Sequence, residues 1–132
     1  MPDRYALGMH ASVASNTKGP YTYAWDRVIV PEAGVVRSVA AVALSLTSNT
    51  IKNSVDVYRQ ADAPAAGSNT ALSILTRPIT LNNDRDVEFG VPTQPGSLLI
   101  AGDVLEVRTY SDTAGAASSF RDLDVTVVVE RT

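Results

Sequence analysis

The chain has 132 residues, a formal net charge of −3 at pH 7 and no cysteine. Its length suits a single domain and its 45% hydrophobic residues can fill one core, so the composition excludes intrinsic disorder. The absence of cysteine excludes disulfide scaffolds and thiolate metal sites, and the scattered basic residues argue against nucleic acid as the main partner.

No segment predicts export or insertion into a membrane. The sequence begins Met1-Pro2-Asp3-Arg4, with charge and without the apolar run of a signal peptide after it. The longest apolar stretch, residues 35–46, contains Arg37, and its length of about a dozen residues is too short to span a bilayer. We therefore expect no membrane partner.

The first part of the chain predicts strands separated by turns. Residues 1–20 are small and mixed, and they are either an amino-terminal arm or a first strand before a β-sandwich domain over residues 21–132. Residues 21–30 are rich in aromatic and β-branched side chains, which is typical of a strand. Residues 35–46 fit a helical stripe or a strand, and their valine content and poor N-cap favour a strand. In that strand, one face would carry Val36, Val42, Leu44 and Leu46.

The second part shows clearer alternation. Residues 54–59, 72–74 and 79–81 predict short strands, and an alternating apolar row at Val87, Phe89 and Val91 predicts another. The turn 101–103 leads into a strand with Leu105, Val107 and Thr109 on one face. Its other face carries Val104, Glu106, Arg108 and Tyr110. The last strand alternates most regularly, with an apolar face of Leu123, Val125, Val127 and Val129.

Together these segments predict the fold class. Eight or so short strands with frequent turn signals and no clear helix indicate an all-β, single-domain antiparallel β-sandwich. The Gly-Pro turns and the long connections favour a jelly-roll-like arrangement over a simple meander.

Motifs for catalysis or for a cofactor are not evident in the sequence. His10 is the single histidine, and without a nucleophile motif around it a surface or packing role is favoured. The turn 82–86 offers oxygen ligands for calcium but matches no EF-hand loop, and Asp122 and Asp124 share a strand face. We therefore expect no enzyme activity, no catalytic residue, no metal site and no cofactor.

Three aromatic residues form the candidate interface. Strict alternation would place Tyr21, Tyr23 and Trp25 on one face of a strand. Tyrosine and tryptophan anchor protein interfaces and sugar platforms, although burial in the core is an alternative explanation for the cluster.

From about residue 28 to residue 130 the chain resembles the jelly-roll decoration (cement or auxiliary head) proteins of tailed-phage capsids. The resemblance lies in residues 79–81, in Leu99 to Val107, in Val125 to Glu130, and in Val30-Pro31 with residues 35–39. It implies a non-enzymatic structural protein that binds the major capsid protein on the outside of a phage head. It also implies a homo-oligomer, often a trimer, located on the virion after assembly in the host cytoplasm. Residues 1–20 fall outside the resemblance and would be the docking arm.

A different function is compatible with the same pattern. The alternative is a carbohydrate- or receptor-binding jelly-roll module of a phage fibre or spike. A small hydrolase is disfavoured, because neither His10 nor Asp124 lies within a catalytic motif.

Overall fold

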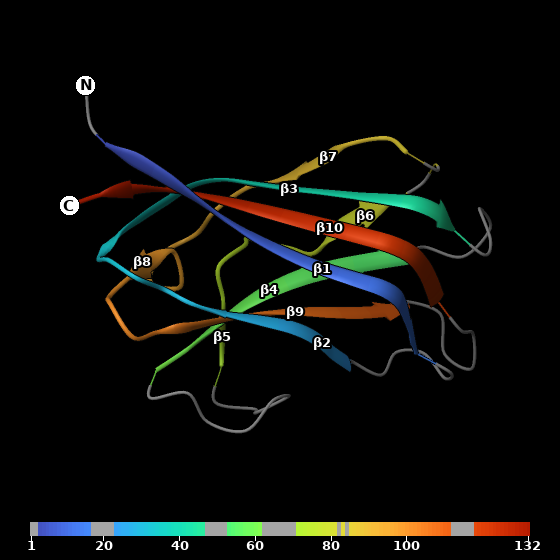
Figure 1. Cartoon of the computed structure of the whole chain (residues 1–132), viewed down its shortest axis with the longest axis horizontal. Helices are drawn as coiled ribbons and strands as arrows, with labels where there is room; N and C mark the ends of the chain where they lie inside the picture. The colour runs from blue at the N-terminus through green and yellow to red at the C-terminus, as the bar shows by residue number, and fades with distance from the viewer. Residues whose placement is uncertain are drawn as a thin grey trace.

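The structure is a computed structural model that describes residues 3–16, 23–46, 53–61, 71–81, 83, 85–111 and 118–132. These residues contain ten β-strands (Figure 1). In the same described part of the chain, no helix is long and apolar enough to cross a membrane.

The strands form two antiparallel sheets (Figure 1). Sheet A has the order β1 (Arg4–Asn16), β10 (Ser118–Arg131), β3 (Gly34–Leu46) and β7 (Glu88–Gly90), and β8 (Leu98–Leu99) also pairs with β3. Sheet B has the order β2 (Tyr23–Ile29), β9 (Val104–Ser111), β4 (Asn53–Gln60) and β5 (Leu72–Ser73), and β6 (Ile79–Leu81) also pairs with β4.

This strand order is that of a jelly roll. The short strands β5 and β6 lie along β4 as one interrupted strand, and β7 and β8 lie along β3 in the same way. The chain crosses between the sheets repeatedly, and its last strand, β10, lies between β1 and β3. The prediction of an all-β, jelly-roll-like antiparallel sandwich is confirmed.

Of the two alternatives for residues 1–20, the described residues 4–16 form a strand within sheet A. β1 pairs with β10 from Arg4 opposite Glu130 to Asn16 opposite Ser118. Leu7 and Met9 of β1 are buried in the core. The amino-terminal segment therefore contributes packing to the sandwich.

The segment with the ambiguous pattern is the strand β3, as predicted, but its buried face differs from the predicted one. Val36 is buried as expected, whereas Leu44 is exposed, and the other buried hydrophobic side chains of β3 are Val39, Ala41 and Ala43. Against β10, Val36 lies opposite Val129 and Ser38 lies opposite Val128, so that Arg37 is an extra residue in a bulge. A bulge shifts the alternation of faces, which is why strict alternation from Val36 fails after it.

The core lies between the sheets, and β9 and β10 supply it as the sequence predicts. Val107 and Leu105 are buried on β9, and the four predicted residues of β10, Leu123, Val125, Val127 and Val129, are buried in the same cluster. Cross-strand packing of branched apolar side chains is the main source of stability in such a sandwich.

The turn before β9 is fixed by its own backbone and one carboxylate. Gly102 has a φ of 93°, a conformation that favours glycine. The Asp103 carboxylate accepts a hydrogen bond from the Ile100 N–H at 3.0 Å and one from Arg59 at 3.4 Å. The Gly102 N–H and the Val30 carbonyl are 2.9 Å apart, which ties the turn to the end of β2.

We predict opposite outcomes for two glycine substitutions. In Gly96→Ala, the new Cβ would clash with the Ser73 carbonyl oxygen, so the backbone must move and the variant should lose at least ~2 kcal/mol of unfolding free energy. Gly8→Ala is the control, because nothing lies within 4 Å of its Cβ, and it should be neutral or slightly stabilised. Urea unfolding of both variants measures this, and equal stabilities would contradict the prediction.

Candidate functional site

The aromatic candidate interface is only partly covered by the described residues. Tyr21 lies outside them, and for Tyr23 and Trp25 the structure describes the backbone alone, within β2. In the pairing with β9, Ala24 lies opposite Arg108 and Asp26 opposite Val107, so a bulge at Trp25 interrupts the strand. Strict alternation, the basis of the prediction, does not hold across a bulge, and the role of the three aromatics stays a prediction.

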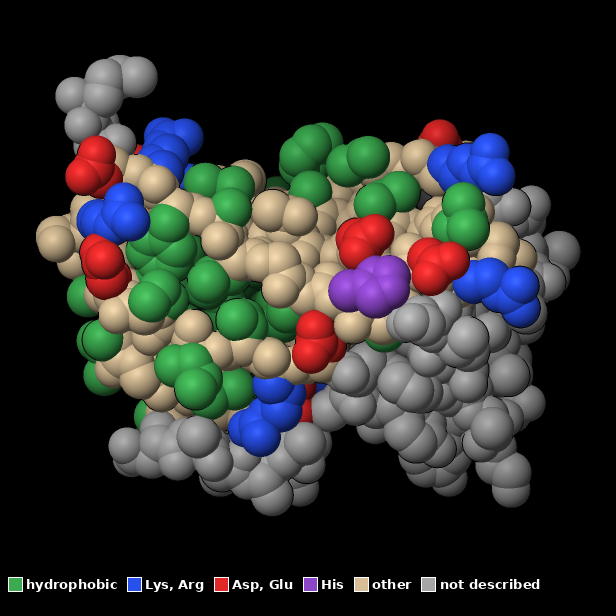
Figure 2. All heavy atoms as spheres, viewed as in Figure 1, with side chains coloured by type: hydrophobic (Ala, Val, Ile, Leu, Met, Phe, Trp, Pro, Cys, Tyr) green, Lys and Arg blue, Asp and Glu red, His purple; other side chains and the backbone are tan. Residues whose placement is uncertain are grey.

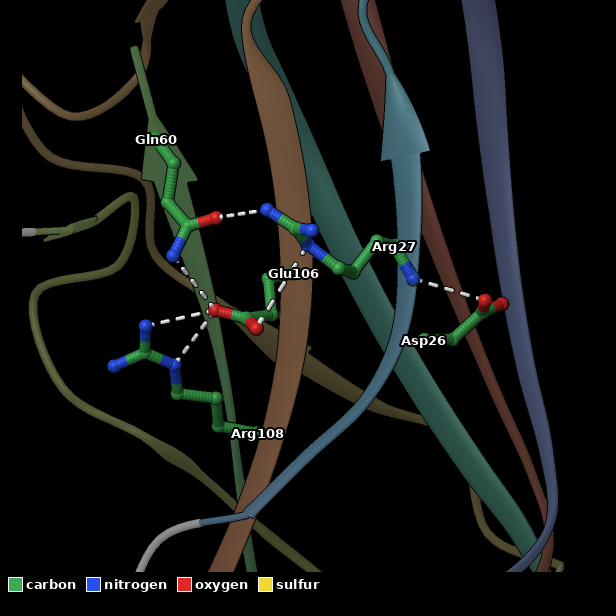
Figure 3. A network of polar contacts seen from close by, with 5 residues as sticks. All are labelled: Asp26, Arg27, Gln60, Glu106 and Arg108. Carbon is green, nitrogen blue, oxygen red and sulfur yellow. Dashed lines mark hydrogen bonds and ion pairs between the residues drawn. The ribbon is translucent and has the colours of Figure 1, made fainter. Parts of the chain in front are cut away.

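A polar network lies on the face of sheet B that points away from the core (Figure 3). Its centre is Glu106 on β9, a fully buried carboxylate. Glu106 accepts two hydrogen bonds from Arg108, at 2.7 and 3.0 Å, and one from the Gln60 amide at 3.1 Å. The Gln60 amide oxygen accepts a hydrogen bond from Arg27 at 2.5 Å, which joins β2 to β4 across β9.

The network continues toward β5 through a second buried carboxylate. Asp56 lies opposite Arg108 in the strand pairing, and its Oδ1 accepts hydrogen bonds from the Ser73 hydroxyl at 2.7 Å and from the Val57 N–H at 2.8 Å. Burial raises the pKa of Asp56 above its ordinary value, although these hydrogen bonds and the Arg108 charge oppose the shift. The Arg108 guanidinium also stacks 4.1 Å from the centre of the Tyr58 ring.

These contacts hold neighbouring strands in register. Arg27, Glu106 and Tyr58 face one another in the pairing of β2, β9 and β4. A slip of any of these strands would break the hydrogen bonds that link Glu106 to Gln60 and Gln60 to Arg27, and would leave the buried Glu106 carboxylate short of a donor. The sequence predicts that Glu106 and Arg108 share the face opposite Leu105, and this is confirmed. It does not predict that they are buried, because alternation alone assigns that face to solvent.

His10 lies on the surface of sheet A near the edge that faces β2. Its side chain is 49% exposed, and its Nδ1 lies 2.6 Å from Asp124 Oδ1. Its backbone N–H donates to the Asp26 carboxylate at 2.9 Å, and Asp122 lies farther away, at 3.8 Å from Nε2. Figure 2 shows this histidine beside acidic side chains. The surface position agrees with the prediction for His10.

The described residues hold no group of three or more His, Cys, Asp or Glu side chains arranged to bind a metal ion. The turn that the sequence offers as a calcium ligand set is covered only in part, since Asn82 and Asp84 lie outside those residues.

An apolar row along β7 and the residue on either side of it faces solvent. Val87, Phe89 and Val91 are 52%, 71% and 61% exposed, and hydrophobic side chains gather along the upper edge of the molecule where Figure 1 places this strand (Figures 1 and 2). Large apolar side chains exposed in one row mark interaction surfaces. The sequence predicts the strand but not its exposure.

A hollow of about 330 Å³ opens beside this row. Its walls are residues 77–80, at the start of β6, and residues 88–91, in and after β7. Arg77 lies on one wall and Glu88 on the other, and neither side chain has a hydrogen bond or ion-pair partner among the described residues. The row and the hollow together form what we call the β7 edge, the candidate functional site.

The fold and this site define a jelly-roll module with an exposed apolar edge. No protein-family model matches the chain, and no curated protein matches it in sequence. Solved structures match it in fold.

A crystal structure of FLHE has a TM-score of 0.52 and 15% identity, covering 98% of both chains. A structure of Eiger TNF from S. frugiperda has a TM-score of 0.53 and 14% identity, covering 100% of this chain and 94% of that one. A structure of infectious bursal disease virus, Gx strain, has a TM-score of 0.54 and 7% identity, covering 98% of this chain and 34% of the viral one. At these identities the likeness is one of fold.

We predict that breaking the buried ion pair is costly and that replacing it is not. Glu106→Ala leaves Arg108 buried without its carboxylate and should lower the unfolding free energy by about 3–5 kcal/mol. The double variant Glu106→Leu/Arg108→Met removes both charges and should recover most of this loss. Glu32→Ala, which breaks an exposed pair with Arg131, is the control and should cost no more than ~1 kcal/mol. A double variant as unstable as Glu106→Ala would contradict the prediction.

We predict a pH-dependent gain from Asp56→Asn. Because the folded-state pKa of Asp56 is raised, its ionisation opposes folding, and wild-type stability falls as pH rises through that pKa. Asparagine keeps an oxygen for the Ser73 and Val57 donors but does not ionise. The stability of the variant relative to wild type should therefore be greater at pH 7 than at pH 3.

Chemical denaturation across this pH range measures the difference. Ser73→Ala provides the converse test, because removing a donor to the carboxylate raises the pKa of Asp56 further and should steepen the decline with pH. A stability difference between Asp56→Asn and wild type that is constant with pH would refute the assignment.

Proposed function

We propose that this chain is a non-enzymatic structural protein of a virion, which binds the outside of a phage head shell and stabilises it. The observation that carries the proposal is the β7 edge, where Val87, Phe89 and Val91 present an apolar row to solvent on a rigid jelly roll. A chain that works by covering and joining other subunits needs such a surface, because burial of apolar area drives association.

Further support comes from the framework behind the edge. β7 pairs with β3, which in turn pairs with β10 over almost its whole length, so the edge belongs to a rigid sheet. Pre-ordered surfaces lose little conformational freedom on binding. The similarity of the sequence pattern to phage decoration proteins points to the major capsid protein as partner, and a trimer on the capsid surface is part of the proposal.

The alternative function is a carbohydrate- or receptor-binding module of a phage fibre or spike. The observation that favours it is the hollow of the β7 edge, which combines an exposed aromatic ring, Phe89, with the charged side chains of Arg77 and Glu88. Sugar sites combine an apolar platform with a few polar groups in a similar way.

Co-sedimentation with phage heads that lack the protein tests the proposed function. We expect saturable binding of the purified chain at a fixed number of copies per shell, with shells that then resist heat and chelator better. A folded chain that does not bind shells would reject the proposal, and binding to defined glycans in an array would then support the alternative.

A further inference from the structure

One residue of β7, Phe89, directs its backbone N–H and C=O away from the neighbouring strand β3. In antiparallel pairs, residues alternate between those that bond to the neighbouring strand and those that point to the other side. The Arg85 N–H donates to the Ala43 carbonyl at 2.8 Å, so odd-numbered residues at this end of β3 turn toward β7. In this register their partners are Glu88, opposite Ala41, and Gly90, opposite Val39. The N–H and C=O of Phe89 therefore point away from β3.

A second hydrogen bond indicates the same backbone orientation for Phe89. The Thr76 N–H donates to the Val91 carbonyl at 2.9 Å, so Val91 turns its backbone away from β3. Phe89 and Val87 lie two and four residues before it and have the same orientation along an extended strand. Among the described residues, no backbone hydrogen bond reaches Phe89 from that side.

The unbonded backbone faces the hollow because two segments diverge there. Residues 74–76 run beside residues 91–93, with hydrogen bonds of 2.9 Å from Thr76 to Val91 and from Thr93 to Ile74. Beyond this closed end, β6 turns to pair with β4 in sheet B, while β7 stays on β3 in sheet A. The hollow of about 330 Å³ is the wedge between them.

At one position, the opposite edge of sheet A is capped by a side chain from sheet B. On β1 the outward N–H of His10 is satisfied by the Asp26 carboxylate at 2.9 Å, which comes from sheet B. Proteins protect edge strands with charges, caps or covering segments, because open edges pair with other chains. Along β7 and at the residue on either side of it, the outer face carries Val87, Phe89 and Val91 in place of charges.

We propose that the β7 edge receives an extended segment of the shell protein, which pairs with β7 as an added strand in sheet A. The identity of the partner rests on the proposed function. The segment exchanges backbone hydrogen bonds with Phe89 and Val87 and places an apolar side chain beside the Phe89 ring. Its next side chain faces the hollow and is polar or charged, because Arg77 and Glu88 line the hollow and neither has a partner among the described residues.

A second copy of this chain fits the edge less well. Two β7 strands paired through residues 87 and 89 would place Glu88 opposite Glu88 of the other copy, and like charges directly opposite are destabilising. A pairing centred on Phe89 would need the outward side of Val91, which Thr76 already occupies.

Two substitutions at one position separate backbone pairing from side-chain contact. Phe89→Ala removes the ring and keeps the N–H, whereas Phe89→Pro also removes the outward N–H. Both should fold, because proline is tolerated on an edge strand where its missing N–H faces solvent. In co-sedimentation with heads that lack the protein, Phe89→Ala should bind more weakly than wild type. Phe89→Pro should bind about tenfold more weakly again. Ile29→Ala, an exposed apolar position on β2, is the control and should bind as wild type does.

Amide hydrogen exchange on the wild-type protein tests strand addition without any variant, so the result does not depend on whether a variant folds. In the free protein, the Phe89 amide should exchange faster than those of Glu88 and Gly90, which bond to β3. On saturation with shells, the Phe89 amide should become protected.

The possible results lead to different conclusions. Equal affinities of Phe89→Ala and Phe89→Pro, with an unprotected Phe89 amide, would overturn strand addition and leave the proposed function intact. A wild-type dimer in analytical ultracentrifugation that is lost in Phe89→Pro would make a second copy the occupant and overturn the proposal. Failure of the wild-type protein to bind shells would reject the proposed function and the shell as donor of the segment.

Discussion

The pairing of β10 between β1 and β3 is the constraint on which the rest of the molecule depends. The last strand of the chain lies opposite Arg4–Asn16 on one side and Gly34–Leu46 on the other. Four of its side chains, Leu123, Val125, Val127 and Val129, enter the core. Because these partners are far apart in sequence, sheet A forms only when both ends of the chain come together, and such long-range pairing makes folding slow.

Sheet B is held by a different kind of interaction. Glu106 and Asp56 are buried carboxylates on the face away from the core, and each accepts a hydrogen bond from a neighbouring strand, Glu106 from Gln60 and Asp56 from Ser73. A buried carboxylate contributes little net stability, but an arrangement in which it loses its donors from the neighbouring strands is penalised. The network therefore specifies the register of β2, β9 and β4, while apolar packing supplies most of the stability.

The two sheets together explain why the β7 edge is open. β6 and β7 are consecutive strands, but β6 pairs in sheet B and β7 in sheet A. The chain must cross between the sheets here, and the crossing leaves Phe89 with backbone groups that point into the gap. An edge produced by the topology of the fold, with an apolar row beside it, is a natural place for a partner to bind.

The sequence by itself determined the strands and most of the core. Alternation of apolar residues identified the buried faces of β9 and β10, and the signal at 101–103 identified a turn that Gly102 completes with a positive φ. These features are local, because side-chain alternation and turn conformation depend on neighbours in sequence. Only the tertiary structure decided the rest. The bulge at Arg37 shifted the buried face of β3, the network buried Glu106 and Arg108, and the position of β7 at a sheet edge exposed Phe89. Each of these depends on which strands become neighbours, and that information is not contained in the local pattern of any one strand.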